Sequence, residues 1–241
     1  MRAVLAYRGL GAVLCRRADA IVVPSEAVAR TLRDRLGYPA QRLSVIPNGV
    51  DPPEDPLPPG PDVGTIALLD PVKGVDVFMR AAAELLGERR DVRFRVFGTG
   101  PEAQSLSELA QELGVGERFT LDGYVEAPSA LTRLRLFVSS SYMENAPLAL
   151  LQAMASGVPA VATRVGGVPE IATDGTVELV DPGDPAALAA AMRTLLDDPE
   201  RARRQGAAAR ARVLEHYTAA DNAEAIRALY AECIRRRAQR R

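Results

Sequence analysis

The residues best suited to chemistry lie in one stretch, SSSYMENAPLALLQAMASG at 139–157. Glu144 and Asn145 stand just ahead of Pro147, and proline is favoured at the first position of a helix. The unpaired amides and the positive dipole end of that helix would face the same space as the Glu144 carboxylate. Such an arrangement is typical of a phosphate-binding site.

A lysine and a glutamine add to this candidate site. Lys73, in DPVKG, follows a predicted strand whose end can share a rim with Glu144, where its ammonium could meet a diphosphate. A solvated turn lysine is the alternative, and the local sequence does not separate the two. Gln152, eight residues after Glu144, lies in the second turn of the predicted helix and can hydrogen-bond without carrying charge. The apolar face of this helix is supplied by Leu148, Leu151 and Ala155.

A second motif, GTGPEA from Gly98 to Ala103, matches the dinucleotide-binding pattern G-x-G-x-x-G/A. It follows the predicted strand RFRVF and opens a helix, and Asp122 stands where the ribose-binding acid of that pattern would be. However, such a unit normally begins its sheet, whereas here a complete strand and helix come first. A tight turn beside a ligand cleft is therefore the favoured interpretation of Gly98, with an NAD-dependent oxidoreductase as an alternative.

Other catalytic sets are missing from the sequence. The single histidine, His216, falls in the late helical region, where we expect a partly buried helix residue, so no Ser-His-Asp, Cys-His or metal-ligand set can be assembled. Cys15 and Cys233 lie near opposite ends without metal-like spacing, which favours free thiols in a reducing cytoplasm and leaves a disulfide open. We expect no metal.

Alternating strands and helices must position the candidate site. A helix is predicted over residues 1–20, a short buried strand at 20–25, a helix capped by Ser25 and ended by Gly37, and a strand at 42–51. The stretch PPEDPLPPGP contains six prolines and predicts a stiff, extended connection. Beyond it, strands are predicted at 65–69, 93–98, 118–125, 134–138 and 158–163, with helices between them and a short helix near SALTRL. The segment at 177–184 leads into a further helix, and two or three helices follow from 199. This order predicts an open, doubly wound, Rossmann-like parallel sheet of the α/β class with a helical C-terminal tail.

Composition limits the partners. The 241 residues are 47% hydrophobic with a net charge of −1, as in a soluble globular protein of one large or two modest domains. Nucleic acid is an unexpected partner, because there is no basic excess and no Trp. No apolar stretch approaches the roughly 20 residues of a membrane span. Five arginines in the last seven residues could touch acidic lipid headgroups, although a solvated helix tail is favoured. The expected location is cytoplasmic, with peripheral contact at the inner face of the membrane as the alternative.

Taken in order from Ala18, these stretches resemble the carboxyl-terminal half of a retaining glycosyltransferase of family 4, the group 1 glycosyltransferases of GT-B fold. The resemblance is carried by ADAIVVPSEAV, VIPNGVD, KGVDVFMRAAAEL, VFGTGPE, LDGYV, SSSYMENAPLALLQAMASGVPAVATRVGGVPEI and LVDPGDPAALAAAM. It implies a hexosyltransferase-like enzyme of polysaccharide or glycolipid biosynthesis, which moves a sugar from a nucleoside diphosphate to an acceptor hydroxyl with retention and without a metal. The acceptor, a glycan, a lipid-linked molecule or a small molecule, stays open. In that family GTGPE is an ordinary strand-to-helix turn.

The resemblance also implies a role for each site residue. Glu144 would be the first acid of the E-x7-E motif and contact hydroxyls of the donor sugar, and Lys73 would neutralise the leaving diphosphate. Tyr124 and Val125 would border the nucleobase, and Gly98 is counted with the donor-binding residues. The amides that would hold the sugar and diphosphate are those around Asn145, Ala146, Pro147, Leu148 and Ala149.

The sequence departs from the family pattern in three respects. Gln152 stands where the family usually has the second acid, which grips the donor ribose, and Leu68 stands where it usually has an arginine. Only the last part of an amino-terminal acceptor domain would fit in 1–51, ahead of a linker at 52–62, a donor domain at 63–198 and helices at 199–241. The alternative function is therefore a noncatalytic or split-enzyme module that needs a separate acceptor domain as its protein partner, and that would expose an apolar surface on residues 1–47.

Overall fold

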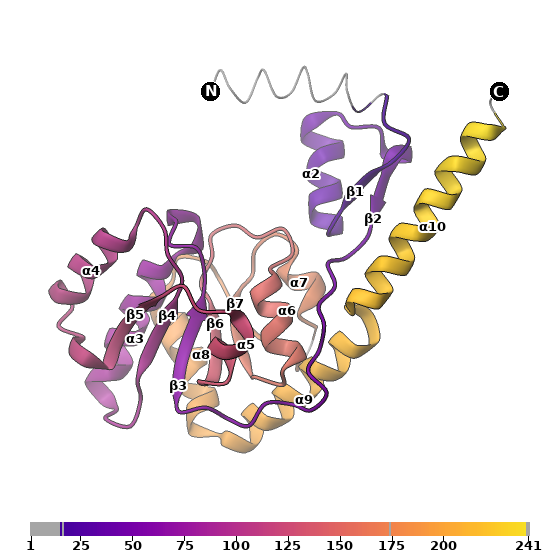
Figure 1. Ribbon diagram of the computed structural model, residues 1–241. Helices are drawn as coiled ribbons and strands as arrows, with labels where there is room; N and C mark the ends of the chain where they lie inside the picture. The colour runs from indigo at the N-terminus through magenta and orange to yellow at the C-terminus, as the bar shows by residue number, and fades with distance from the viewer. Residues whose placement is uncertain (1–14, 16, 174, 240–241) are drawn as a thin grey trace.

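The strands of the protein form two separate parallel sheets, as the computed structural model shows for residues 15, 17–173 and 175–239 (Figure 1). The smaller sheet pairs β1 (Ile21–Val23) with β2 (Leu43–Val45). The larger sheet has the order β5-β4-β3-β6-β7-β8, and its neighbouring strands are all parallel. Its strands are β3 (Asp62–Ile66), β4 (Phe94–Phe97), β5 (Phe119–Gly123), β6 (Leu134–Ser139), β7 (Ala160–Thr163) and β8 (Glu178–Val180). The chain builds outward from β3 to one edge, returns to β6 and builds to the other edge, so the predicted doubly wound sheet is confirmed.

The smaller unit contains α2 (Glu26–Leu36) between its two strands. The Ser25 hydroxyl accepts the Val28 N–H at 3.3 Å, and Gly37 ends the helix at φ 70°, so both predicted caps are confirmed. The prediction of a buried strand here was wrong for most of β1, because Val22 is 44% exposed and only Val23 is buried. Successive side chains of a strand point to opposite faces, and a sheet of two strands with one helix leaves a face uncovered. The helix predicted over residues 1–20 lies mostly outside the described residues, and the described residues 17–20 are not helical.

The proline-rich connection runs along the larger domain in an extended conformation, with neither helix nor strand between residues 52 and 61 (Figure 1). Its backbone is fastened at several points. The Leu57 N–H donates to the Ser156 carbonyl at 2.9 Å, and Arg210 donates to the carbonyls of Pro53 and Glu54 at 2.8 Å. The connection is therefore held in place by hydrogen bonds as well as by its prolines.

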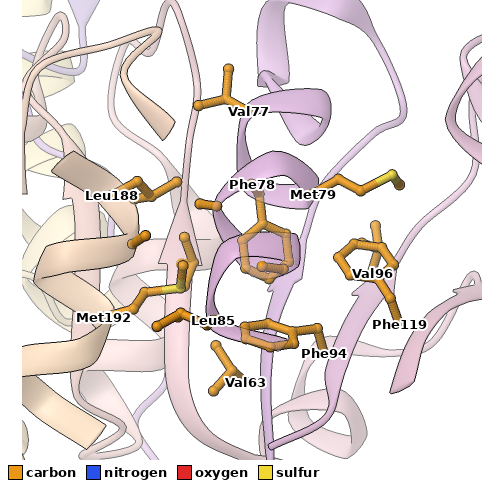
Figure 2. Packing of buried hydrophobic residues seen from close by; sticks show 14 of the residues in the cluster. Val63, Val77, Phe78, Met79, Leu85, Phe94, Val96, Phe119, Leu188 and Met192 are labelled. Atoms are coloured by element: carbon orange, nitrogen blue, oxygen red, sulfur yellow. The ribbon is translucent and has the colours of Figure 1, made fainter. Parts of the chain in front are cut away.

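Helices cover both faces of the larger sheet. On one face, α3 (Val75–Glu88), α4 (Ala103–Glu112) and α8 (Pro185–Asp197) enclose an apolar core. In this core Phe78 of α3 lies edge-on against Phe94, with ring centroids 5.9 Å apart (Figure 2). On the other face, α5 (Ala127–Leu131), α6 (Leu148–Ala155), α7 (Val168–Ile171) and α9 (Pro199–His216) enclose a second core. Val96 and Phe97 are adjacent in β4 but belong to the two different cores, as expected when both faces of a parallel sheet are buried.

One predicted element position was wrong. The first strand of the larger sheet is β3 at Asp62–Ile66 rather than 65–69. Its start is fixed by pairing with β4 and β6 on both sides, which outweighs the weak strand preference of Asp62 and Gly64. The short helix predicted near SALTRL is confirmed as α5, which begins at Ala127 with Pro128 in its first turn.

The C-terminal region forms two helices, α9 and α10 (Ala219–Ala238), within the predicted number. Figure 1 shows α10 running from the larger domain past the smaller sheet. The predicted partial burial of His216 was wrong, since its side chain is 47% exposed at the end of α9. Tyr217, the next residue, occupies the buried position instead. None of the helices in the described part of the chain is both long and apolar enough to span a bilayer.

Candidate functional site

A cleft of about 450 Å³ lies outside the carboxyl ends of β3 and β6. These two strands are neighbours at the point where the strand order reverses, which is where open α/β sheets bind ligands. Its walls come from the segments that follow β3 and β6, from the start of α6, and from Pro24 and Asn48 on the amino-terminal side of the linker. The sheet topology therefore brings residues from several parts of the chain to one cleft.

Lys73 and Glu144 are in direct contact at this cleft, so the predicted meeting of the two strand ends is confirmed. The Lys73 Nζ lies 2.7 Å from Glu144 Oε1, and the same oxygen accepts the Ser141 hydroxyl at 2.7 Å. The side chains of Lys73 and Glu144 are 26% and 10% exposed. Lys73 is also the only lysine in the sequence. An ammonium has three N–H donors, so Lys73 can bind a further anionic oxygen while it keeps Glu144.

The turn that carries Lys73 is fixed to the loop after β6. The Asp70 carboxylate accepts the Val72 N–H at 2.9 Å and caps the 3-10 turn at Pro71–Lys73. Gly74 ends this turn at φ 58°, and a Cβ there would lie 2.3 Å from the Ser140 carbonyl oxygen. The Ser140 hydroxyl in turn donates to the Lys73 carbonyl at 3.2 Å. These contacts explain why an otherwise long and mobile side chain has a defined position.

The amino-terminal end of α6 opens on the same cleft. Pro147 is the N-cap of α6, with φ −69° and ψ 114°, and the helix begins at Leu148, so the prediction of Pro147 at the first helical position was wrong by one residue. The extended ψ of Pro147 places it just outside the helix, where its carbonyl accepts the Leu151 N–H at 3.2 Å. Among the residues that the structure describes, no side chain caps this end, and the first amides of a helix have no intrahelical acceptor. They are therefore available to an anionic or hydroxylic ligand.

The helix face of α6 differs from the prediction at one residue. Leu151 and Ala155 are buried as expected, but Leu148 is 50% exposed and lines the cleft. The reason is its place in the first turn, beyond the edge of the core that covers the rest of the helix. Gln152 lies one turn after Leu148, is partly buried and is not among the residues that line the cleft.

Three other predicted donor-binding residues also lie outside the cleft lining. Tyr124 is 70% exposed just after β5, and its hydroxyl donates to Glu126 Oε1 at 2.6 Å, which raises the pKa of Tyr124 above its ordinary value. Val125 packs against the core beneath it. Gly98 follows β4, the neighbour of β3, and Tyr124 follows β5, the edge strand beyond β4.

Close packing of the backbone explains why the GTGPEA motif begins with a glycine. A Cβ on Gly98, at φ 154°, would lie 1.8 Å from the Ala67 carbonyl oxygen, so only glycine fits between these backbones. Asp122, the residue that a dinucleotide site would need, pairs instead with Arg95 at 2.9 Å. Because the motif also follows β4 rather than a strand at the switch point, the turn interpretation is the better one.

Two residues that the sequence did not single out hold the loop ahead of α6. The Asn48 side-chain amide donates to the Ala146 carbonyl at 3.0 Å. Thr163 donates its hydroxyl to the Ser141 carbonyl at 2.6 Å and so supports the serine that contacts Glu144. The sequence signal that could have identified such residues is a small polar side chain at the end of a strand, as in the Pro-Asn-Gly turn and the Ser-Ser-Ser run.

Comparison with protein families and known proteins gives consistent matches. The family model described as "Glycosyl transferases group 1" matches residues 56–212, and that described as "Glycosyltransferase Family 4" matches residues 3–54. The chain is 36% identical over 217 residues to a D-inositol 3-phosphate glycosyltransferase of Nocardia farcinica, covering 78% of the chain and 47% of that relative. It is 30% identical over 204 residues to a 2-deoxystreptamine glucosyltransferase of Streptomyces kanamyceticus, covering 76% of the chain and 53% of that relative.

Solved structures share the arrangement of the chain. HepE from Anabaena, solved in complex with UDP and glucose, superposes with a TM-score of 0.85 at 22% identity over 94% of this chain and 67% of HepE. TarM of S. aureus gives a TM-score of 0.82 at 21% identity over 90% of this chain and 44% of TarM. The chain thus spans about half the length of the curated relatives it matches.

Proposed function

This chain belongs to the group 1 glycosyltransferases, and we propose that it binds a nucleoside-diphosphate sugar as the donor half of a retaining glycosyltransferase. The expected fold, half of a GT-B enzyme, is confirmed by its likeness to HepE. The donor-site assignment rests on one observation: Lys73 and Glu144 meet at 2.7 Å beside the uncapped end of α6, at the switch point of the sheet.

In this proposal the cleft holds the sugar and the diphosphate. Glu144 Oε1 is occupied by Lys73 and Ser141, which turns the carboxylate into a fixed acceptor for sugar hydroxyls through its other oxygen. Lys73 and the first amides of α6 would face the diphosphate, where negative charge grows as it departs. The bond between the anomeric carbon and the diphosphate oxygen breaks, and its electron pair stays on the diphosphate. The acceptor oxygen bonds to the anomeric carbon on the same face, and its proton passes to the departing diphosphate oxygen.

The nucleoside is proposed to extend along the rim toward β4 and β5. The strand order places Gly98 next to the cleft and Tyr124 beyond it. The exposed Tyr124 ring and Val125 would border the base, and Gln152 would supply a neutral hydrogen bond to the ribose. That HepE was solved with UDP supports a nucleoside diphosphate as the ligand class.

We propose the following division of the chain. Residues 1–51 are the last part of an acceptor-side domain, 52–62 are the linker, 63–198 are the donor domain and 199–241 are the C-terminal helices. The two separate sheets and the extended proline-rich segment between them support these boundaries.

The donor assignment is tested by calorimetric titration of the protein with UDP-, GDP- and ADP-sugars and with NAD. We expect saturable binding of one nucleotide sugar that is lost in Glu144→Ala and kept in Glu88→Ala, which removes an ion-paired glutamate far from the cleft. Binding of NAD alone would overturn the proposal. A hydrolysis and transfer assay on the same samples then measures turnover.

A second candidate, a split-enzyme module that needs an acceptor domain, is favoured by an apolar groove of about 380 Å³ between β1 and α10. Val22, Tyr230 and Ile234 lie along it and are 44%, 67% and 70% exposed. Parallel sheets are normally covered on both faces, and the curated relatives are about twice as long as the matched region, so an α/β acceptor domain is the proposed occupant. Donor binding without turnover supports this candidate, and turnover by the chain alone contradicts it.

A further inference from the structure

A carboxylate of the larger domain completes the cap of α2 in the smaller unit. Glu170 of α7 accepts the Glu26 N–H at 2.8 Å and the Ala27 N–H at 2.7 Å, one on each carboxylate oxygen. With Ser25 accepting the Val28 N–H, each of the first three amides of α2 has an acceptor. Such hydrogen bonds are charge-assisted and lie at the positive end of the helix dipole, so they favour the docked position of α2.

The backbone around Glu170 is held in place by hydrogen bonds within the larger domain. Its own carbonyl accepts Arg212 Nη2 at 2.8 Å and the Tyr217 hydroxyl at 3.0 Å. The Arg212 Nε also donates to the Ile171 carbonyl at 2.6 Å. Helix α7 is therefore fastened to α9 and to the residue that follows it, and its carboxylate cannot follow α2 if the smaller unit moves away.

The loop that leads to Glu170 also touches the loop between β6 and α6, residues 140–147, which we call the donor loop. A Cβ on Gly166, at φ 51°, would lie 1.6 Å from the Glu144 carbonyl oxygen, and the Gly167 N–H donates to that oxygen at 3.3 Å. A Cβ on Gly167 would lie 2.1 Å from the Asn145 carbonyl oxygen and 2.8 Å from the Ser25 Cβ. Gly166 is thus packed against the donor loop, and Gly167 is packed between that loop and the start of α2.

We propose that Glu170 is a positioning residue for the donor cleft: by holding the first turn of α2, it sets Pro24 as a wall of the cleft. Pro24 lines the cleft and directly precedes the Ser25 cap, whereas Glu170 is not a lining residue. This inference rests on the proposed donor site. Figure 1 shows the geometry, with α7 at the part of the larger domain nearest α2.

Thermodynamic linkage between docking of α2 and donor binding makes the inference testable by measuring either one. If docking of α2 favours donor binding, then bound donor must favour docking by the same factor. Hydrogen exchange of the amides at 26–28 should therefore slow when a nucleotide sugar occupies the cleft. A merely structural role of Glu170 would not produce this ligand-dependent protection.

The experiment compares Glu170→Ala and Glu170→Gln with Asp184→Ala, by hydrogen exchange and by calorimetric titration with the nucleotide sugar that the wild type binds. Asp184 is a matched control because its carboxylate caps α8 within the larger domain by accepting the Ala187 N–H at 2.9 Å. We expect Glu170→Ala to raise both the exchange rate at 26–28 and the donor Kd about tenfold, as expected for one lost cap. Glu170→Gln, which keeps one amide oxygen as acceptor, should fall between, and Asp184→Ala should lower the Tm with Kd unchanged.

An unchanged Kd in Glu170→Ala, or an equal rise of Kd in Glu170→Ala and Asp184→Ala, would overturn the inference. Failure of the donor site itself has a different signature, because the wild type would then bind none of the nucleotide sugars. In that case exchange at 26–28 still decides the role of Glu170: faster exchange in Glu170→Ala alone supports the docking contact, and unchanged exchange refutes it.

Discussion

The contact between Lys73 and Glu144 predicts a strong thermodynamic coupling of the two side chains and unequal losses of stability when each is replaced alone. Replacing Lys73 with Met leaves a carboxylate that is 10% exposed with Ser141 as a remaining donor. Loss of one partner of a largely buried pair should lower the free energy of unfolding by about 2.5 kcal/mol. Replacing Glu144 with Gln leaves an ammonium that is 26% exposed and can be hydrated, so we expect a loss of about 1 kcal/mol.

The double variant should lose only about 1.5 kcal/mol, because neither charge is left without its partner. The coupling free energy of the pair is then about 2 kcal/mol, well above the 1 kcal/mol limit of exposed pairs. In a chain of 241 residues, 1 kcal/mol moves the Tm by about 2–4 °C, so Lys73→Met should lower it by roughly 5–10 °C.

Ligand binding separates the two roles. Urea unfolding gives the coupling free energy, and titration with a nucleoside diphosphate and with the matching nucleotide sugar gives the binding terms. Lys73→Met should weaken both ligands, whereas Glu144→Gln should weaken the nucleotide sugar and spare the nucleoside diphosphate. Since Lys73 is the only lysine, reductive ¹³C-methylation gives a single side-chain ammonium signal that should shift when diphosphate binds.

Two results would refute this reasoning. Additive effects of the single variants on unfolding would mean that the charges do not interact at the observed distance. Wild-type affinity of Lys73→Met for the nucleoside diphosphate would mean that the ammonium does not meet the phosphates.

Three further outcomes follow from local geometry. In urea unfolding, Arg95→Leu should lower the free energy of unfolding by about 3 kcal/mol, because it leaves the buried carboxylate of Asp62 in β3 without its partner. Arg201→Leu breaks an exposed pair and should cost less than about 1 kcal/mol. Gly98→Ala should lower the free energy of unfolding by about 3 kcal/mol or more, since its Cβ has no room. Gly87→Ala in α3 has open space and should raise the free energy of unfolding by about 0.5–1 kcal/mol. Equal effects of the two variants on the Tm would contradict the close-approach argument. Gln152→Glu should tighten nucleotide-sugar binding several-fold by adding a charged ribose contact, and unchanged or weaker affinity in calorimetry would count against that role.

Much of the fold follows from features that are local in sequence. Ser25 and Gly37 bound α2, and the alternation of apolar strands with amphipathic helices identifies a doubly wound sheet. The misplaced first strand shows where local signals fail. Asp62 and Gly64 are poor strand formers, but β4 and β6 flank them, so pairing decides the strand.

The same division holds for the site. Lys73 and Glu144 could be brought together by prediction because each follows a parallel strand, and such strand ends meet at one edge of a sheet. Asn48 reaches Ala146 across 98 residues, and Glu170 reaches Glu26 across 144. These contacts depend on how two separate sheets dock, which no sequence period encodes. Exposure of Leu148 and His216 was likewise set by where the core ends rather than by helix periodicity.

The docked arrangement implies that the cleft has two kinds of wall. The donor loop is held within the larger domain from two sides, by the Lys73 turn and by the glycine pair at 166 and 167. Pro24 and Asn48 come from the amino-terminal side of the linker and depend on the docking of that unit. A diphosphate that contacts only Lys73 and the amides of α6 should therefore tolerate loss of docking, while a ligand that fills the whole cleft should not. Glu170→Ala should accordingly weaken the complete nucleotide sugar more than the nucleoside diphosphate, and equal weakening of the two ligands would contradict this division of the cleft.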